Sequence, residues 1–417
     1  MRELFKNRPV LAWAAYDWAN SAFATTVMAG FFPLFFKDFW TGDSDPTVSS
    51  KLLGIANGIA GVLVALLAPV LGAIADRGQR RKRFLMAWTF VGVVATAALC
   101  WVGQGEWAMA CALYVIGTMG FNGAIVFYDA LLMDIAKPHE YDRVSSFGFS
   151  AGYLGGGLLF VINVLMFLKP AMFGLASPAS AVQMSFLTVA VWWLLFSLPL
   201  WLWVPEAQST SKIGFMTAAK LGFSELRNTA MHIARYKQLL LFLVAYWLYI
   251  DGVNTIIKMA VDLGINRGLN RQSLIVALLL TQFVAFPAAM AFGYLGERIG
   301  AKRGILIGLV VYAFVTIYAA YLHTEAEFYS LAVLIGLVQG GVQSLSRSLF
   351  GRLVPEGKSA EFFGFFNMMG RFAAIIGPPL VGVITNMGGG QNAFAYVLLP
   401  MFIFGGVLLI KVRVGEQ

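Results

Sequence analysis

The sequence predicts an all-α membrane protein with twelve transmembrane helices, arranged as two pseudo-symmetric six-helix bundles. Three observations predict this fold class. Of the 417 residues, 59% are hydrophobic and only 12% are charged, which excludes an ordinary water-soluble domain. About twelve apolar runs approach or exceed the length that crosses a bilayer. Finally, three sequence landmarks recur in the same order in the two halves of the chain.

Each apolar run is close to or longer than the roughly 18 residues that mark a transmembrane helix. The first run follows a short basic N-terminal segment and is too long for the core of a signal peptide, so we expect it to be retained as a helix. The predicted spans lie near 10–37, 52–75, 84–103, 107–134, 144–168, 183–204, 239–261, 272–296, 304–322, 328–350, 360–386 and 392–411.

The basic residues are distributed unevenly between the two sides of the predicted bundle. If both termini are cytoplasmic, most of the 30 Lys and Arg residues fall in cytoplasmic segments, as Arg80 and Arg81 do after the second span. This bias accounts for the net charge of +9 without a nucleic-acid partner. We therefore expect a multi-pass protein of the cytoplasmic (inner) membrane with both termini cytoplasmic.

The longest segment between spans divides the chain into two halves. It contains Pro205, several basic residues and an amphipathic stretch from Ile213 to Leu226. This pattern indicates a cytoplasmic connector with a short helix on the membrane surface. The predicted organisation is an N-terminal bundle over residues 1–204, a connector over 205–238 and a C-terminal bundle over 239–417.

Internal repetition supports two homologous halves. The segment Gly72–Arg77 (Gly-Ala-Ile-Ala-Asp-Arg) corresponds to Gly293–Arg298 (Gly-Tyr-Leu-Gly-Glu-Arg), and each precedes a basic cluster. Phe147–Phe149 and Phe363–Phe365 are both Phe-Gly-Phe. Parallel six-helix repeats are a transporter architecture, with the substrate site near the midplane where the repeats meet.

The third landmark is an Asp-x-x-Asn pair within the first span of each half. Asp17 and Asn20 lie in the first span, and Asp251 and Asn254 lie in the seventh. An ionisable side chain at the bilayer centre costs roughly 2.5–3.5 kcal/mol on insertion scales, so such residues usually face a pathway. In the functional interpretation, both carboxylates bind an amino group or carry a coupled proton, and the amides orient the substrate. In the structural interpretation, each carboxylate hydrogen-bonds a neighbouring helix.

The two carboxylates are expected at different depths. Asp17 lies about 10 Å beyond the inner end of its span at 1.5 Å per residue, where a role in a cytoplasmic gate is open. Asp251 is expected close to the midplane and is the stronger candidate for a binding or proton site. In that case, replacing Asp251 by Asn would abolish accumulation driven by a pH gradient while sparing exchange.

Further polar side chains share helix faces with these candidates. Gln339, Gln343 and Arg347 lie at four-residue spacing in the tenth span, and Asn122 and Asp129 lie seven residues apart in the fourth. We expect Asn122, Gln339 and Gln343 to contact substrate or a coupled proton.

Arg371, midway along the eleventh span, has two open roles. Its planar guanidinium could bind a substrate carboxylate through two parallel hydrogen bonds. Alternatively it neutralises Asp17 or Asp251, because an unpaired Arg at the midplane is too costly to persist.

Charged residues at the inner helix ends are candidates for a cytoplasmic gate. Ion pairs there would form when the cavity faces outward and break when it opens inward. Solvated surface charge is the alternative. The predicted gate set is Asp76, Arg77, Asp129, Glu297, Arg298 and Arg347.

Several of these segments resemble a known family. Gly72–Lys82, with Gly-x-x-x-Asp-Arg followed by a basic cluster, resembles the signature loop between helices two and three of the major facilitator superfamily. Tyr16–Phe23, Leu248–Thr255, Gly340–Phe350 and Ala360–Phe366 are similar to the branch typified by the yeast autophagy-related vacuole effluxer. The resemblance implies the major facilitator fold, with helices 1, 4, 7 and 10 lining a central cavity, and alternating access. The yeast relative is associated with release of amino acids from the vacuole.

The sequence therefore predicts a secondary active transporter for a small polar metabolite, with an amino acid or related compound as the leading candidate. Proton coupling is open. A non-transporting receptor or scaffold, or a lipid flippase with the same fold, are the alternatives. The predicted spans contain no catalytic constellation, metal cluster or phosphate loop, so we expect no enzyme activity and no cofactor. The expected partners are the substrate, the lipid bilayer and, for coupling, protons, and the protein is expected to be a monomer.

Overall fold

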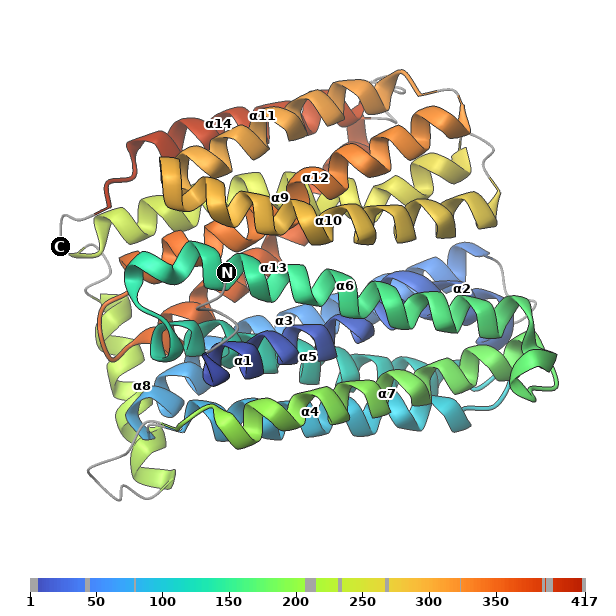
Figure 1. Cartoon of the computed structure of the whole chain (residues 1–417), viewed down its shortest axis with the longest axis horizontal. Coiled ribbons are helices and arrows are strands. Elements are labelled where there is room, and N and C mark those ends of the chain that lie inside the picture. The colour runs from blue at the N-terminus through green and yellow to red at the C-terminus, as the bar shows by residue number, and fades with distance from the viewer. Residues whose placement is uncertain are drawn as a thin grey trace.

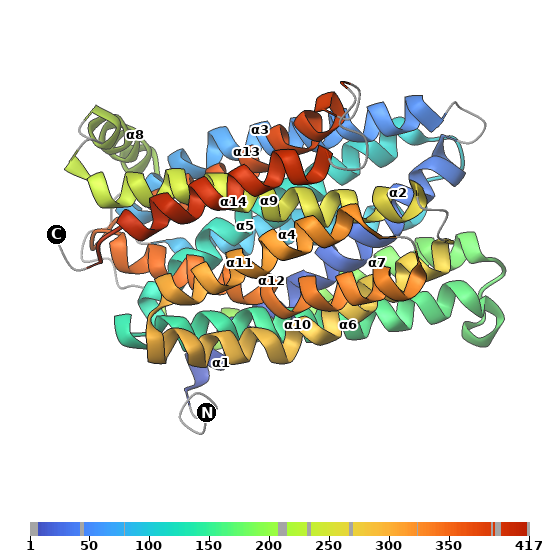
Figure 2. The ribbon, with the colours of Figure 1, turned by 90° about the horizontal axis from the view of Figure 1, so that it is seen from above.

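The computed structural model describes residues 7–41, 46–78, 80–206, 215–231, 235–266, 270–322, 324–384, 387 and 393–414, and their regular elements are all helical. Long helices run side by side along the longest axis of the molecule (Figure 1). Helix α8 lies at one end of this bundle, the same end at which the last described residues of the chain lie (Figures 1 and 2). We call this end the α8 end and the opposite one the far end.

The N-terminal half contains the first six spans. Its first span is composite, because an α-helix continues into more loosely wound turns. The elements are α1 (Arg8–Ala22), η2 (Phe23–Phe31), α2 (Phe32–Phe35), η3 (Phe36–Trp40), α3 (Pro46–Gly78), α4 (Arg81–Ala98), η4 (Leu99–Trp101), α5 (Trp107–Ile135), η5 (Pro138–Glu140), α6 (Tyr141–Leu168), η6 (Pro170–Phe173) and α7 (Pro178–Trp203).

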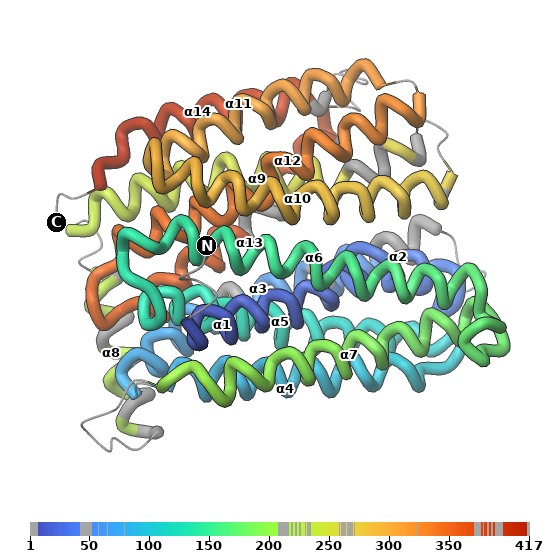
Figure 3. The backbone as a smooth tube through the Cα atoms, viewed as in Figure 1, coloured from blue at the N-terminus to red at the C-terminus, as the bar shows by residue number. Residues whose placement is uncertain are grey.

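The C-terminal half contains the other six spans and follows the connector helix α8 (Phe215–Met231). In the tube drawing, the first and last spans lie in different halves (Figure 3). The elements are α9 (Lys237–Asn266), α10 (Arg271–Ile299), α11 (Ala301–Ala320), α12 (Glu325–Leu353), α13 (Ser359–Ile384) and α14 (Ala393–Lys411).

Length and composition agree with a membrane location. Ten helices in the described part of the chain are long and apolar enough to cross a bilayer, and Ala395–Lys411 is a shorter apolar helix. Large apolar side chains such as Leu66, Val310 and Phe404 are more than half exposed on the outside of the bundle. Such a surface suits lipid and not water.

Local sequence signals explain where several helices begin. Asn270 accepts the Ser273 N–H at 2.8 Å at the start of α10. Thr324 and Glu327 form a reciprocal capping box at the start of α12, with hydrogen bonds of 2.9 and 3.3 Å. These side chains satisfy backbone donors that the first helical turn leaves without partners.

The two halves repeat one cap between helices. Lys82, at the start of α4, donates to the carbonyl oxygens of Trp201 and Val204 at the end of α7, at 3.2 and 2.8 Å. Lys302, at the start of α11, donates to the carbonyl oxygens of Ile410 and Val412 at the end of α14, at 3.1 and 3.0 Å. In each half the third span thus neutralises the carbonyl end of the sixth.

The halves meet along two pairs of long helices, α3 with α13 and α6 with α10. The second pair runs side by side through the centre of Figure 1. Glycines allow this close approach at the α8 end: a methyl group at Gly72 would overlap the backbone carbonyl of Ala360, and one at Gly293 would meet Ser146.

We expect Gly72→Ala to shift the conformation without unfolding the protein. Gly72 contacts the other half, so the added methyl group prevents closure of the α8 end but leaves each bundle intact. Gly120→Ala is the matched control, because its methyl group would overlap Gly92 of the same half. Gly120→Ala should lower the thermal unfolding midpoint more than Gly72→Ala does. If the two variants lowered the thermal unfolding midpoint equally, the distinction between contacts within one half and contacts between the halves would be contradicted.

Candidate functional site

A cavity of about 420 Å³ lies between the two halves. Its wall comes from α1, η2, α5 and α6 on one side and from α9, α10, α12 and α13 on the other. A cavity of this size between helices of a bundle suits a small molecule. The polar residues expected from the sequence to contact substrate and found in its wall are Asp17, Asn20, Asn254, Gln339 and Gln343.

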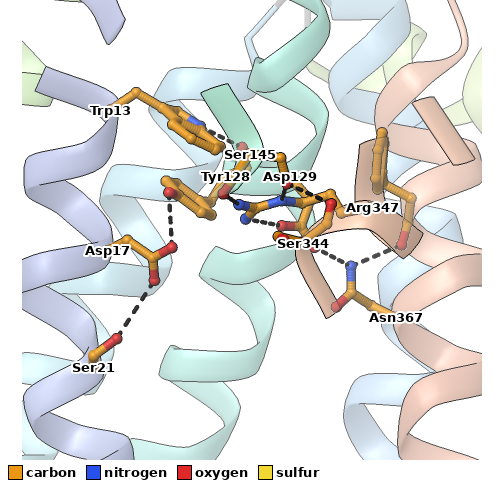
Figure 4. A network of polar contacts seen from close by, with 10 residues as sticks. Trp13, Asp17, Ser21, Tyr128, Asp129, Ser145, Ser344, Arg347 and Asn367 are labelled. Atoms are coloured by element: carbon orange, nitrogen blue, oxygen red, sulfur yellow. Dashed lines mark hydrogen bonds and ion pairs between the residues drawn. The ribbon is translucent and has the colours of Figure 1, made fainter. Parts of the chain in front are cut away.

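Toward the α8 end, the cavity is bounded by a buried ion pair between the halves. Arg347 Nη1 of α12 lies 3.0 Å from Asp129 Oδ1 of α5, and the two side chains are 3% and 7% exposed. Asn367 Nδ2 of α13 donates to the second carboxylate oxygen of Asp129 at 3.0 Å (Figure 4). One carboxylate of the N-terminal half is therefore held by two residues of the C-terminal half.

Hydrogen-bond acceptors and aromatic rings surround the guanidinium of Arg347. Its Nε donates to Ser145 Oγ and its Nη2 to the Ser145 carbonyl oxygen, both at 2.8 Å. Its Cζ lies 4.4 Å from the ring centroid of Phe149, 4.7 Å from that of Trp13 and 5.3 Å from that of Tyr128. These contacts join hydrogen bonds, an ion pair and cation–π interactions in a site sheltered from water. The geometry is that of a lock between the halves.

Asp17 lies in the cavity wall beside this lock. Tyr128 Oη donates to Asp17 Oδ2 at 3.1 Å, and Ser21 Oγ lies 3.5 Å from Oδ1 (Figure 4). Trp13 positions Tyr128 by stacking on its ring at 4.4 Å and by donating from Nε1 to its carbonyl oxygen at 2.8 Å. Within the described residues, no Lys or Arg nitrogen lies within 4.0 Å of the Asp17 carboxylate. Neutral hydroxyl groups thus supply its hydrogen bonds.

Asp251 is not among the residues that line the cavity. Its Oδ1 accepts the Gly377 N–H of α13 at 3.1 Å and the Thr255 hydroxyl at 3.4 Å. Asn254 does line the cavity and donates to the Gly370 carbonyl at 3.3 Å. A step of three residues turns a helix by about 300°, so these two side chains point about 60° apart. Helix α13 packs over Asp251, whereas Asn254 remains in the cavity wall.

Two further candidates have different outcomes. Asn122 is 3% exposed and lies outside the cavity wall, and its Oδ1 has no hydrogen-bond partner among the described residues. Phe121 and Ile125, its neighbours on α5, do line the cavity. The side chain of Arg371 lies outside the described part of the structure.

At the α8 end, Asp76 joins the halves by capping a helix. Its carboxylate accepts the N–H groups of Ala360 and Glu361, at 3.1 and 2.8 Å, at the start of α13. It also pairs with Arg81 at 2.7 Å, and Arg81 lies 2.6 Å from Asp134. An acidic side chain is favoured here because the N-terminus of a helix carries partial positive charge.

The other predicted gate residues at this end differ in their contacts. Glu297 of α10 lies 3.4 Å from Arg143 of α6, so it also links the halves. Arg77 and Arg298 are exposed. The expected cross-half contacts are present at Asp76, Glu297, Asp129 and Arg347.

A family model described as "Vacuole effluxer Atg22 like" matches residues 44–416. The chain belongs to this family. An uncharacterized MFS-type transporter of Bacillus subtilis, YxiO, is 37% identical over 95% of this chain and 93% of its own length. Autophagy-related protein 22-2 of Aspergillus clavatus is 28% identical over 63% of this chain, and the match spans 46% of that longer protein.

Solved structures show the same fold. The human organic anion transporter MFSD10 (TETRAN) superposes with a TM-score of 0.73 at 17% identity, covering 96% of this chain and 99% of that one. The proton:xylose symporter XylE gives 0.71 at 13% identity, covering 98% and 95%. The fold is therefore that of the major facilitator superfamily, in agreement with the similarity to the MFS-type transporter of Bacillus subtilis, and the protein is a multi-pass membrane protein of this superfamily.

Several residues that take part in contacts between the halves were not predicted from the sequence. Arg352 of α12 donates to Asp142 Oδ1 of α6 at 2.8 Å and to the Pro138 carbonyl at 3.0 Å, and Ser348 also contacts Asp142. Ser348 and Arg352 are four residues apart on α12, a spacing that does indicate a shared face. Tyr128 directly precedes Asp129, and Asn367 lies four residues before Arg371 on α13, so each adjoins a residue that the sequence already indicates.

Proposed function

We propose that this Atg22-like protein is a secondary active transporter that moves a small polar metabolite across the cytoplasmic membrane by alternating access. The leading substrate class is an amino acid or a related amine. In this proposal the protein works as a monomer with both termini in the cytoplasm. The observation that carries the proposal is a cavity shared by both halves and bounded at the α8 end by polar contacts between them.

The contacts at the α8 end are of a kind that can break and form again. Ion pairs and helix caps at Arg347, Asp76 and Glu297 join the two halves there. The cavity wall extends toward the far end as far as Leu274 and Phe328, which lie in the first turns of α10 and α12. Rocking of one bundle against the other would open the α8 end and close the far end around the same cavity.

In this proposal, Asp17 is the residue that binds an amino group or carries a coupled proton. It lines the cavity, whereas Asp251 is bonded to the backbone of α13. Asp17 is also linked through Tyr128 to the aromatic enclosure of Arg347. A change in the charge state of Asp17 would therefore act next to the contact that holds the halves together.

For Asp251 we expect a structural role in supporting α13. Asp251→Asn keeps an oxygen acceptor for the Gly377 N–H and should retain accumulation driven by a pH gradient. Asp251→Ala leaves that buried N–H without this acceptor, at a cost of about 1–3 kcal/mol. The measurements are the thermal unfolding midpoint and gradient-driven uptake. Loss of gradient-driven uptake in a stably folded Asp251→Asn variant would return the coupling role to Asp251.

The proposed function is tested with purified protein. A thermal-shift screen against metabolite pools finds ligands that stabilise it, and proteoliposome uptake with and without a pH gradient tests whether they are transported. We expect at least one stabilising amine or amino acid to accumulate inside the vesicles. Stabilisation without transport of any ligand would favour a receptor, and movement of labelled lipid between leaflets would favour a flippase.

A further inference from the structure

The charges in the cavity wall point to a narrower class of ligand. Among the described lining residues, the ionisable acids and bases that carry charge at neutral pH are Asp17, Asp129 and Arg347. Asp129 and Arg347 form an ion pair at 3.0 Å, so their charges cancel locally. Asp17 is the charged residue of the described wall that forms no ion pair within 4.0 Å, and its described hydrogen bonds come from the neutral hydroxyl groups of Tyr128 and Ser21.

Arg347 is not arranged to bind a ligand carboxylate. Its three described hydrogen bonds go to Asp129 and Ser145, and three aromatic rings cover the guanidinium. The residue is only 2% exposed. Capture of a carboxylate would require Arg347 to give up Asp129, which would leave a buried charge without its partner at high cost.

Asp17, in contrast, is arranged to receive a cation. Tyr128 and Ser21 hold its carboxylate by neutral hydroxyl groups, and α6 approaches closely because a methyl group at Gly152 would meet both Ser21 and Asp17. Tyr153 and Gln343 stand in the same wall, bonded to each other at 3.3 Å. A protonated amine could therefore pair with Asp17 and find neutral acceptors beside it.

The wall of the cavity becomes apolar toward the far end. There the wall is formed by apolar side chains from α9, α10 and α12, among them Ile257, Leu274, Phe328, Leu331 and Ile335. An apolar group of a ligand would be favoured in this region, whereas an anionic group would find no cation among the described residues of that wall.

We propose that the ligand is an organic monocation, with a protonated amine at Asp17 and an apolar body directed toward the far end, and that a carboxylate on the ligand is not required. This inference rests on the proposed transport function and names its substrate class. It differs from an amino-acid substrate in one testable respect: removal of the carboxylate should strengthen binding.

The test compares amino acids with their decarboxylated amines on purified full-length protein by calorimetry. The pairs are phenylalanine with 2-phenylethylamine and leucine with 3-methylbutylamine, and 3-phenylpropionate is the anionic control. We expect each amine to bind at least about tenfold more tightly than its amino acid, and the anion not to bind. Equal or weaker binding of the amines overturns the proposal. If Arg371→Gln abolishes a preference for the amino acids, the ligand is a zwitterion.

Variants assign the effect to Asp17. Asp17→Asn keeps one acceptor oxygen for the Tyr128 hydroxyl, and the Ser21 hydroxyl can turn to accept from the new amide N–H. The variant should weaken amine binding by about tenfold or more with little change in the thermal unfolding midpoint. Glu356→Gln removes the same charge at an exposed site with no described ligand contact, and should bind amines as the wild type does. Wild-type amine affinity in Asp17→Asn overturns the proposal. Amine binding without uptake into proteoliposomes would instead leave the binding site in place and contradict the transport function.

Discussion

Replacement of Arg347 by Gln is expected to destabilise the protein by about 3–5 kcal/mol, because it removes one partner of a buried ion pair. Asp129 would lose its cation, and Ser145 would lose the two hydrogen bonds that it accepts from the guanidinium of Arg347. Three aromatic rings would also lose their cation–π partner. Thermal unfolding in detergent measures the loss, and transport should fall with it.

Two comparisons give this prediction its specificity. The double variant Arg347→Gln/Asp129→Asn removes both charges and should recover part of the lost stability. Arg83→Gln breaks the ion pair between Arg83 and Glu206, in which the Arg83 side chain is 69% exposed. This change should cost at most about 1 kcal/mol of stability. If Arg83→Gln lost as much stability as Arg347→Gln, or if Arg347→Gln lost none, Arg347 would have no special role in holding the halves together.

Replacement of Asp76 by Ala is expected to open the α8 end. Two N–H groups at the start of α13 would lose their acceptor, and Arg81 would keep only Asp134 among its described partners. A lost helix cap costs about 0.5–2 kcal/mol. Because this cap lies between the halves, the cost falls on the closed conformation, and about 1–2 kcal/mol changes its population by roughly 5–30-fold.

The opening can be measured as a distance between spin labels. Lys137 and Glu356 are exposed at the α8 end, in loops of opposite halves, and can carry the labels once Cys100 and Cys111 are replaced. Asp76→Ala should broaden the distance distribution toward longer values, and Asp76→Asn should do so less because it keeps an acceptor. An unchanged distribution in Asp76→Ala would remove this cap from the gating contacts.

The spans, their grouping into halves and several cavity residues follow from local patterns. Hydropathy reports the free energy of transfer of each segment into lipid, which is a property of the segment alone. The same holds for the spacing of Gln339 and Gln343 along one face of α12, and both line the cavity.

The roles of the two aspartates depended on the neighbours of each helix. Asp17 and Asp251 occupy corresponding positions of a repeated motif, yet one lines the cavity and the other is bonded to Gly377. The difference depends on the rotation of α1 and α9 and on which helix packs against them. No local pattern contains that information, because it is set by contacts between distant segments.

The sequence by itself determined a polytopic helical membrane protein with two repeated halves and costly polar groups inside them. Those features are fixed by local composition and periodicity, whose energetics each segment carries independently. Only the tertiary structure decided that Arg347 is enclosed with Asp129, that Asp251 supports α13 and that Asp17 is left facing the cavity. Arg347 and Asp129 are 218 residues apart, so their pairing arises only when the two bundles close on each other.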